Sequence, residues 1–131
     1  MTGTRKILAW TGLTLLSLAF LFFGGTKLAG AEMHIENFAS WGYPTWFVYV
    51  TGAIEVLGAA LIIFPATRWI GGGLLAATMA GAVTTHIAHA EWAALALPLV
   101  LLAITGTIAW RQRPRALLTR STTLDPREAG R

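Results

Sequence analysis

Glu55 is the side chain whose position in this sequence most strongly suggests chemistry. It stands in the middle of residues 46–64, a run of 19 residues with no other charged side chain. At about 1.5 Å per residue, a helix of this length crosses the hydrocarbon core of a bilayer. An acid at the centre of such a span costs on the order of 2.5–3.5 kcal/mol on insertion scales, so it normally faces a protein interior or a cavity.

Three roles for Glu55 are open. The first is structural: a protonated or paired carboxyl group, hydrogen-bonded to a hydroxyl of another helix, for which Thr14, Ser17 and Thr84 are available. The second is to anchor a ligand in a hydrophobic pocket, and the third is to relay protons. Burial favours the neutral acid unless a cation such as Lys27 lies close.

Lys27, Gly52 and Gly58 are the residues expected around Glu55. Lys27 follows Gly24-Gly25-Thr26, and it either extends from a helix end toward water or pairs with an acid or a ligand. Gly52 and Gly58 flank Glu55 at a spacing of three, on the same helix face, which leaves room for a neighbouring backbone or a ligand. This spacing suits a cavity that opens outward, with Glu55 at its floor and Lys27 near its rim.

Two histidines, His86 and His89, are followed by Glu91. Histidines at i and i+3 can share a metal ion, with ligands from the first outer loop to complete the site. The spacing alone does not establish one, so we predict no metal site and keep His86 as a candidate ligand-binding residue. Bis-histidine haem is disfavoured, because the only other histidine, His34, is in that outer loop. The chain has no cysteine, which excludes thiol redox chemistry and cysteine nucleophiles.

Four apolar segments must position these groups. Only 12% of the residues are charged, about half the share of a soluble domain. The segments cover about residues 7–27, 46–64, 69–87 and 92–110, and predict an all-α, four-helix transmembrane bundle formed by residues 1–110. Small residues recur every four positions at Gly73, Ala77 and Gly81, which predicts close helix packing on that face. Pro98 predicts a slight kink in the last span.

The first outer loop, residues 27–44, predicts a short helix that lies at the membrane interface. Its apolar side chains Ile35, Phe38 and Trp41 are spaced by three. Gly42-Tyr43-Pro44 predicts a turn before the second span. Alternatively, the first apolar run could be a signal peptide that is cleaved at Ala29-Gly30-Ala31. We favour this less, because the run is longer than the apolar region of a signal peptide.

Positive charge and tryptophan predict the orientation. With the N-terminus inside, nine of the ten Lys and Arg side chains lie on the cytoplasmic side, and Lys27 alone lies outside. All six tryptophans then fall at span ends, where aromatic belts occur. We therefore predict a multi-pass plasma-membrane protein with both termini cytoplasmic. The basic tail, residues 111–131, is expected to be mobile and to meet anionic lipid rather than nucleic acid.

Several short motifs resemble the DoxX and DoxX-like family of membrane proteins. They are Phe23-Gly24-Gly25-Thr26-Lys27-Leu28, Phe38, Gly42-Tyr43-Pro44, Gly52-Ala53-Ile54-Glu55-Val56-Leu57-Gly58, Pro65-Ala66-Thr67-Arg68 and Thr85-His86. The resemblance covers about residues 7–110 and implies a four-helix membrane bundle. The family takes its name from a subunit of a membrane thiosulfate:quinone oxidoreductase. By position, Lys27, Glu55 and their neighbouring glycines match its recurrent residues, but the resemblance transfers no catalytic residue.

The resemblance and the buried acid together predict an accessory or anchor subunit of a quinone-linked membrane redox system, or one that binds a quinone or another hydrophobic ligand. We expect it not to be catalytic by itself. The expected ligand-binding residues are Glu55, Lys27, Gly52, Gly58, Thr84 and His86. The expected partners are the lipid bilayer, oxidoreductase subunits and further copies of the chain. Two alternatives stay open: a structural module that docks a partner through its small-residue faces, and a small proton-coupled transporter.

Overall fold

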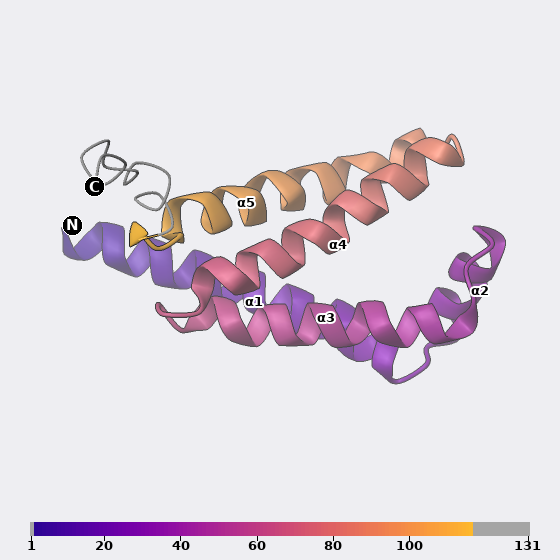
Figure 1. The fold of residues 1–131 in the computed structure, drawn as a ribbon, viewed down its shortest axis with the longest axis horizontal. Coiled ribbons are helices and arrows are strands. Elements are labelled where there is room, and N and C mark those ends of the chain that lie inside the picture. Colours follow the sequence, from indigo (N-terminus) through magenta and orange to yellow (C-terminus); the bar gives the residue numbers. More distant parts are fainter. Residues whose placement is uncertain (1, 117–131) are drawn as a thin grey trace, which may run out of the picture.

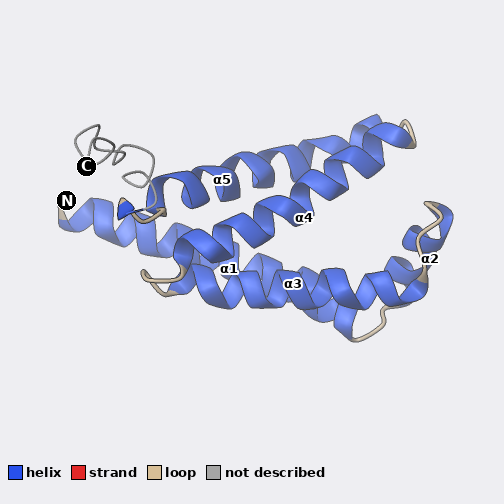
Figure 2. Cartoon of the chain, viewed as in Figure 1, coloured by secondary structure: helices blue, strands red, loops and turns tan. Residues whose placement is uncertain are grey.

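The computed structural model describes residues 2–116, and within this range every regular element is helical (Figures 1 and 2). The elements are α1 (Gly3–Leu28), α2 (Glu32–Ser40), α3 (Thr45–Ile63), α4 (Arg68–Ala88), the 3₁₀ turn η1 (Trp92–Leu95) and α5 (Ala96–Gln112). Of the tail predicted to be mobile, residues 117–131 lie outside the described range.

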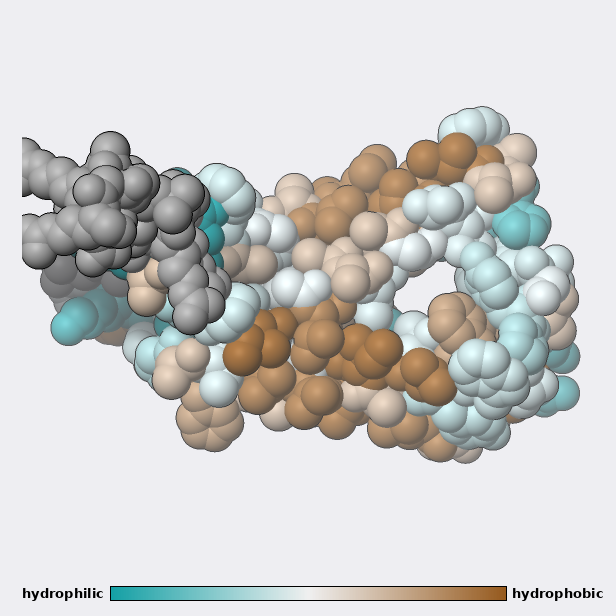
Figure 3. Space-filling view, viewed as in Figure 1, coloured by the Kyte–Doolittle hydropathy of each residue, from teal (hydrophilic) through white to brown (hydrophobic). Residues whose placement is uncertain are grey.

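Four segments are long and apolar enough to cross a membrane: α1, α3, α4, and η1 with α5. This confirms the predicted all-α fold with four spans, and the short helix α2 stands where the spacing of the first outer loop placed it. Many large apolar side chains are exposed along these spans, as brown surface in Figure 3 shows, which suits contact with lipid. Pro98 lies in the first turn of α5, directly after the 3₁₀ turn η1, where a missing backbone N–H is tolerated. The kink expected at Pro98 stays a prediction.

Glycines set the closest helix contacts. A Cβ atom added to Gly24 of α1 would lie 2.8 Å from the carbonyl oxygen of Gly52 on α3. A Cβ atom added to Gly71 of α4 would lie 2.7 Å from the carbonyl oxygen of Gly58, again on α3. Such contacts let helix backbones approach each other in lipid. α3 is therefore packed against α1 through one glycine and against α4 through another.

The face of α4 predicted to pack closely is not the one that does so. A Cβ atom added to Gly73 or Gly81 would meet nothing within 4 Å, whereas one added to Gly72 would lie 2.9 Å from the backbone of Ala109 on α5. Three consecutive glycines offer every face of the helix, so spacing alone did not identify the packed one. Ala77 and Gly81 instead face a cavity.

The helices pack in the order α1–α3–α4–α5. A buried core, Phe20, Ala59, Ile62, Leu75, Met79 and Leu101, joins all four near the middle of the molecule. Toward the end that carries α2, the α4–α5 pair diverges from α3, and Figure 3 shows an opening there through which the background is visible. We call this end the α2 end.

The opposite end holds the start of α1 and the end of α5 (Figure 1), and we call it the basic end after Arg5, Lys6, Arg68, Arg111 and Arg113. Here Arg68 donates hydrogen bonds to the carbonyl oxygens of Ile62 and Ile63, at 2.7 and 3.0 Å. These carbonyls have no partner within α3, because they end the helix. Arg68 thus caps α3 and fixes the tight turn into α4.

Candidate functional site

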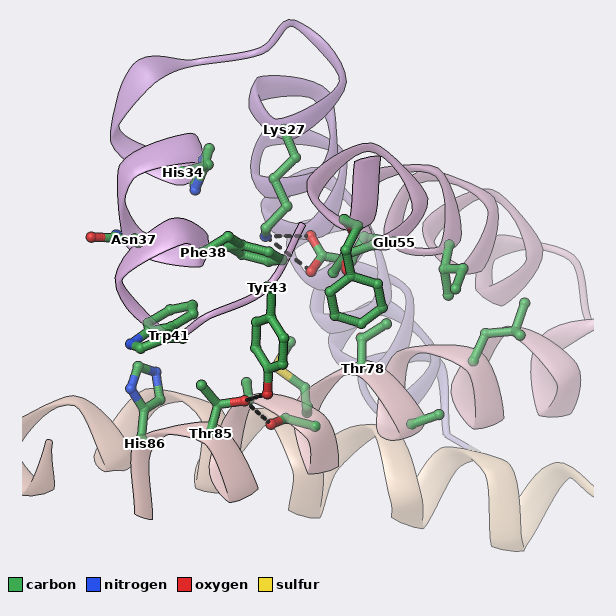
Figure 4. A pocket seen from close by; sticks show the side chains of 18 residues that line it. Lys27, His34, Asn37, Phe38, Trp41, Tyr43, Glu55, Thr78, Thr85 and His86 are labelled. Atoms are coloured by element: carbon green, nitrogen blue, oxygen red, sulfur yellow. Dashed lines mark hydrogen bonds and ion pairs between the residues drawn. The ribbon is translucent and has the colours of Figure 1, made fainter. Parts of the chain in front are cut away.

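A cavity of about 440 Å³ lies at the α2 end, between α2, α3 and α4 (Figure 4). Its walls are largely apolar and include Phe38, Phe47, Ile54, Leu74 and Met79. Polar side chains reach it from four helices and from the turn before α3: Lys27, His34, Asn37, Tyr43, Thr51, Glu55, Thr78, Thr85 and His86. An apolar chamber with a few converging polar groups is the usual form of a small-molecule site.

Lys27 and Glu55 form an ion pair in the wall of this cavity. The Lys27 Nζ donates to both carboxylate oxygens of Glu55, each at 3.0 Å. The side chain of Glu55 is 2% exposed and that of Lys27 is 13% exposed. The pairing confirms that the two residues lie together and that the acid faces the protein interior.

The pair forms because Gly24 and Gly52 let α1 and α3 touch. Lys27 and Glu55 each stand three residues after one of these glycines, so both project from the crossing. Gly52 and Gly58 are buried at helix contacts, against α1 and α4 respectively, and do not line the cavity. Their spacing left room for either a neighbouring backbone or a ligand, and the structure shows a neighbouring backbone at both glycines.

The hydroxyl groups expected as partners of Glu55 lie elsewhere. Ser17 donates to the carbonyl oxygen of Ala59 at 2.8 Å, and Thr14 is exposed. Thr84 is also exposed, donates to the carbonyl oxygen of Ala80, and does not line the cavity. Glu55 is therefore a paired carboxylate whose partner is a cation.

Thr85 occupies the position in the cavity that was expected for Thr84. Its hydroxyl donates to the carbonyl oxygen of Gly81 at 2.8 Å, so the Tyr43 hydroxyl, also 2.8 Å away, is the donor between these two side chains. This bond joins the turn before α3 to α4 across the cavity (Figure 4).

A second set of contacts joins the end of α2 to the end of α4 and the loop after it. The Trp41 Nε1 donates to Glu91 Oε1 at 2.9 Å, and Glu91 Oε2 lies 2.7 Å from the Nδ1 of His86. The Trp41 and His86 rings meet edge to face at 5.4 Å. The Trp41 hydrogen bond, followed by that of His86, holds the pKa of Glu91 below its ordinary value. We call these three side chains the α2 latch.

The other histidines have separate roles. His34 on α2 lies 2.9 Å from the Thr26 hydroxyl, which donates to the carbonyl oxygen of Phe23, so His34 Nε2 is the donor. Burial first, and then the charge of Lys27, lower the pKa of His34. His89 contacts the carbonyl oxygen of Thr85 and does not line the cavity. Within residues 2–116, no three His, Asp or Glu side chains are grouped so that they would hold a metal ion.

Sequence reasoning found Lys27, Glu55 and His86 but missed Tyr43 and Thr85. Trp41 was predicted to lie in an apolar stripe and in an aromatic belt, but not to donate a hydrogen bond to Glu91. The sequence Gly42-Tyr43-Pro44 predicted a turn at Tyr43, but nothing in it indicated that the Tyr43 side chain would contact Thr85 on α4.

Comparisons with known proteins agree with this architecture. The sequence model of the DoxX-like family matches residues 11–108. A Bacillus subtilis protein named "Putative oxidoreductase CatD" is 34% identical over 112 residues, which is 80% of each chain. The uncharacterized protein YdgD of the same organism is 34% identical over 79 residues, covering 55% of this chain and 68% of its own. No solved structure matches.

Proposed function

Because the chain belongs to the DoxX-like family of membrane proteins, we propose that it is a quinone-binding subunit of a membrane redox system. The name of the Bacillus subtilis relative, "Putative oxidoreductase CatD", supports the redox context. The observation that carries the proposal is the cavity itself, an apolar chamber among membrane-spanning helices with a buried ion pair in its wall.

The residues of the cavity fit a quinone ring. Phe38, Phe47 and Met79 offer apolar and aromatic surfaces for a flat ring. The ammonium group of Lys27 has three N–H donors and uses two on Glu55, so one can be donated to a quinone carbonyl oxygen. A volume of about 440 Å³ lies within the range of ligand pockets, roughly 300–1,000 Å³.

The opening between α3 and α4 supports entry from the bilayer. Figure 3 shows the molecule open on its side at the α2 end, while the α2 latch holds α2 across the end itself. A ligand with an apolar tail can then place its ring in the cavity and leave the tail in lipid.

A bound quinone accepts two electrons and two protons, and the chain's own residues have the simpler tasks of binding, orienting and exchanging protons. Lys27 orients a carbonyl group, and the Glu55 oxygens can hold a proton beside it. The sequence has no cysteine, so any thiol chemistry would be performed by a partner subunit. We place the protein in the plasma membrane, with its basic end on the cytoplasmic side, as the distribution of positive charge predicts.

A matched pair of glycine variants tests the proposal. Gly81 and Gly73 both lie on α4, both are exposed, and a Cβ atom at either meets nothing within 4 Å, but only Gly81 lines the cavity. Gly81→Phe therefore fills the cavity, and Gly73→Phe is its control.

The assay measures binding of decylubiquinone to the purified protein in nanodiscs. Binding is detected as quenching of tryptophan fluorescence, since Trp41 lines the cavity. We expect at least tenfold weaker binding for Gly81→Phe and no change for Gly73→Phe. Equal binding by both variants would refute the site. No binding by the unmodified protein would refute the function and favour the alternative of a docking module.

A further inference from the structure

A second hollow lies at the other end of the molecule, between α1 and α5. It has a volume of about 530 Å³, and its walls are apolar: Leu8, Ala9, Gly12, Leu13, Leu15 and Leu16 on α1, and Ile104 and Ile108 on α5. Leu8 and Leu15 are 66% and 63% exposed, so no part of the described chain covers them. We call this hollow the α1–α5 groove.

Cations continue both walls of the groove toward the basic end. Arg5 precedes Leu8 and Ala9 by three and four residues, which places it on the groove-lining stripe of α1. Arg111 follows Ile108 by three residues and Ile104 by seven, on the corresponding stripe of α5.

Within residues 2–116, the charged side chains at this end are all basic. The acidic residues between positions 2 and 116 are Glu32, Glu36, Glu55 and Glu91, and all lie at the α2 end or in the cavity. Arg113 stacks over the Trp110 ring at 3.3 Å, and its buried Nη1 finds no hydrogen-bond acceptor within the described residues. The basic end therefore combines an apolar groove with Arg5 and Arg111, which form no ion pair with any carboxylate among residues 2–116.

This combination favours one occupant over the other candidates. A second copy in the same membrane orientation would bring its own Arg5 and Arg111 to the same depth, where like charges repel. An anionic phospholipid matches both the apolar groove and the arginines. Its acyl chain is apolar, and its phosphate group is a bidentate acceptor for Arg.

We propose that the α1–α5 groove binds one acyl chain of an anionic phospholipid whose phosphate is held by Arg5 and Arg111. This site is separate from the quinone cavity and does not rest on the proposed function. The lipid would complete the packing of α1 with α5, which the protein leaves open near the basic end.

The experiment is native mass spectrometry of the full chain, released from detergent with added phosphatidylglycerol or phosphatidylcholine of identical acyl chains. We expect one phosphatidylglycerol per chain, with at least fivefold preference over phosphatidylcholine. Two basic residues near a membrane surface contribute about 1 kcal/mol each, so Arg5→Gln/Arg111→Gln should weaken retention by about thirtyfold.

Variants of the groove separate the acyl site from the charge. Gly12→Phe fills the groove, and a Cβ atom there meets nothing within 4 Å. Gly106→Phe on α5 is the control, since Gly106 has the same free space but does not line the groove. Lipid should be lost from the first variant and kept by the second.

Three results would overturn the proposal. Equal retention of the two lipids would show that charge plays no part. Retention by Gly12→Phe would show that the groove is not the site. A dimer that Gly12→Phe abolishes would identify the occupant as a second copy of the chain.

Discussion

Replacing Lys27 with methionine would strand the carboxylate of Glu55 inside the protein. Glu55 is 2% exposed and both of its oxygens accept from Lys27, so removing the cation leaves a buried charge without a partner. Breaking one side of a buried pair costs about 3–5 kcal/mol, whereas replacing both sides by apolar groups is often neutral or stabilising.

The upper limit of this cost follows from proton uptake, because a stranded carboxylate can be neutralised by a proton. For a carboxyl group with an ordinary pKa of about 4.3, protonation at pH 7 requires about 3.7 kcal/mol, and at pH 5 it requires about 1 kcal/mol. We therefore expect Lys27→Met to lose roughly 3–4 kcal/mol of unfolding free energy at pH 7 and far less at pH 5.

Glu55→Gln should behave differently. The stranded Lys27 lies one residue from the end of α1 and is 13% exposed, so its ammonium group can move toward water. Its loss should be smaller than that of Lys27→Met and should not shrink on acidification. The double variant Lys27→Met/Glu55→Met should recover the stability of the unmodified protein.

Unfolding by sodium dodecyl sulfate in mixed micelles, followed by fluorescence of the six tryptophans, measures these free energies at both pH values. A cost of Lys27→Met that does not change with pH would refute the account of Glu55 as a buried ionised partner. A double variant no more stable than Lys27→Met would show that the loss comes from packing.

Three further outcomes are expected. Gly24→Ala should lose about 1–3 kcal/mol by overpacking against a backbone oxygen 2.8 Å away, whereas Gly25→Ala, with free space, should be neutral or stabilising in thermal unfolding. Trp41→Phe keeps the ring but not the hydrogen bond to Glu91, so hydrogen exchange of the α2 amides should quicken, and unchanged exchange would show that the latch does not hold α2. Because the pKa of His34 is lowered below 6.5, the unfolded chain binds more protons than the folded chain as the pH falls, and the melting temperature should fall as pH drops below about 6.5. His34→Gln should remove this part of the pH dependence. An unchanged dependence in that variant would show that His34 is not its source.

The spans and the short helix α2 could be predicted because they depend on composition and local spacing. The same holds for the meeting of Lys27 with Glu55, since an isolated cation and an isolated acid in apolar segments have few other partners. These features follow from the free energy of placing each side chain in lipid.

Other features depend on rotation about a helix axis, which local sequence does not determine. Thr84 and Thr85 differ by about 100° around α4, and only packing against α3 and α5 decides which one lines the cavity. The bond from Trp41 to Glu91 joins residues 50 positions apart and requires the arrangement of three helices.

The contact between Gly58 and Gly71 controls a region that it does not touch. It lies on the basic-end side of the cavity, where α3 and α4 begin to diverge, so it sets the crossing angle of the two helices. Any side chain added at this crossing would change the angle, and the displacement would grow with distance along the helices. The width of the cavity beside Glu55 is thus decided in part by two residues without side chains, of which Gly58 lies less than one turn from Glu55 on α3. A family member with a larger residue at either position would have a cavity of another size.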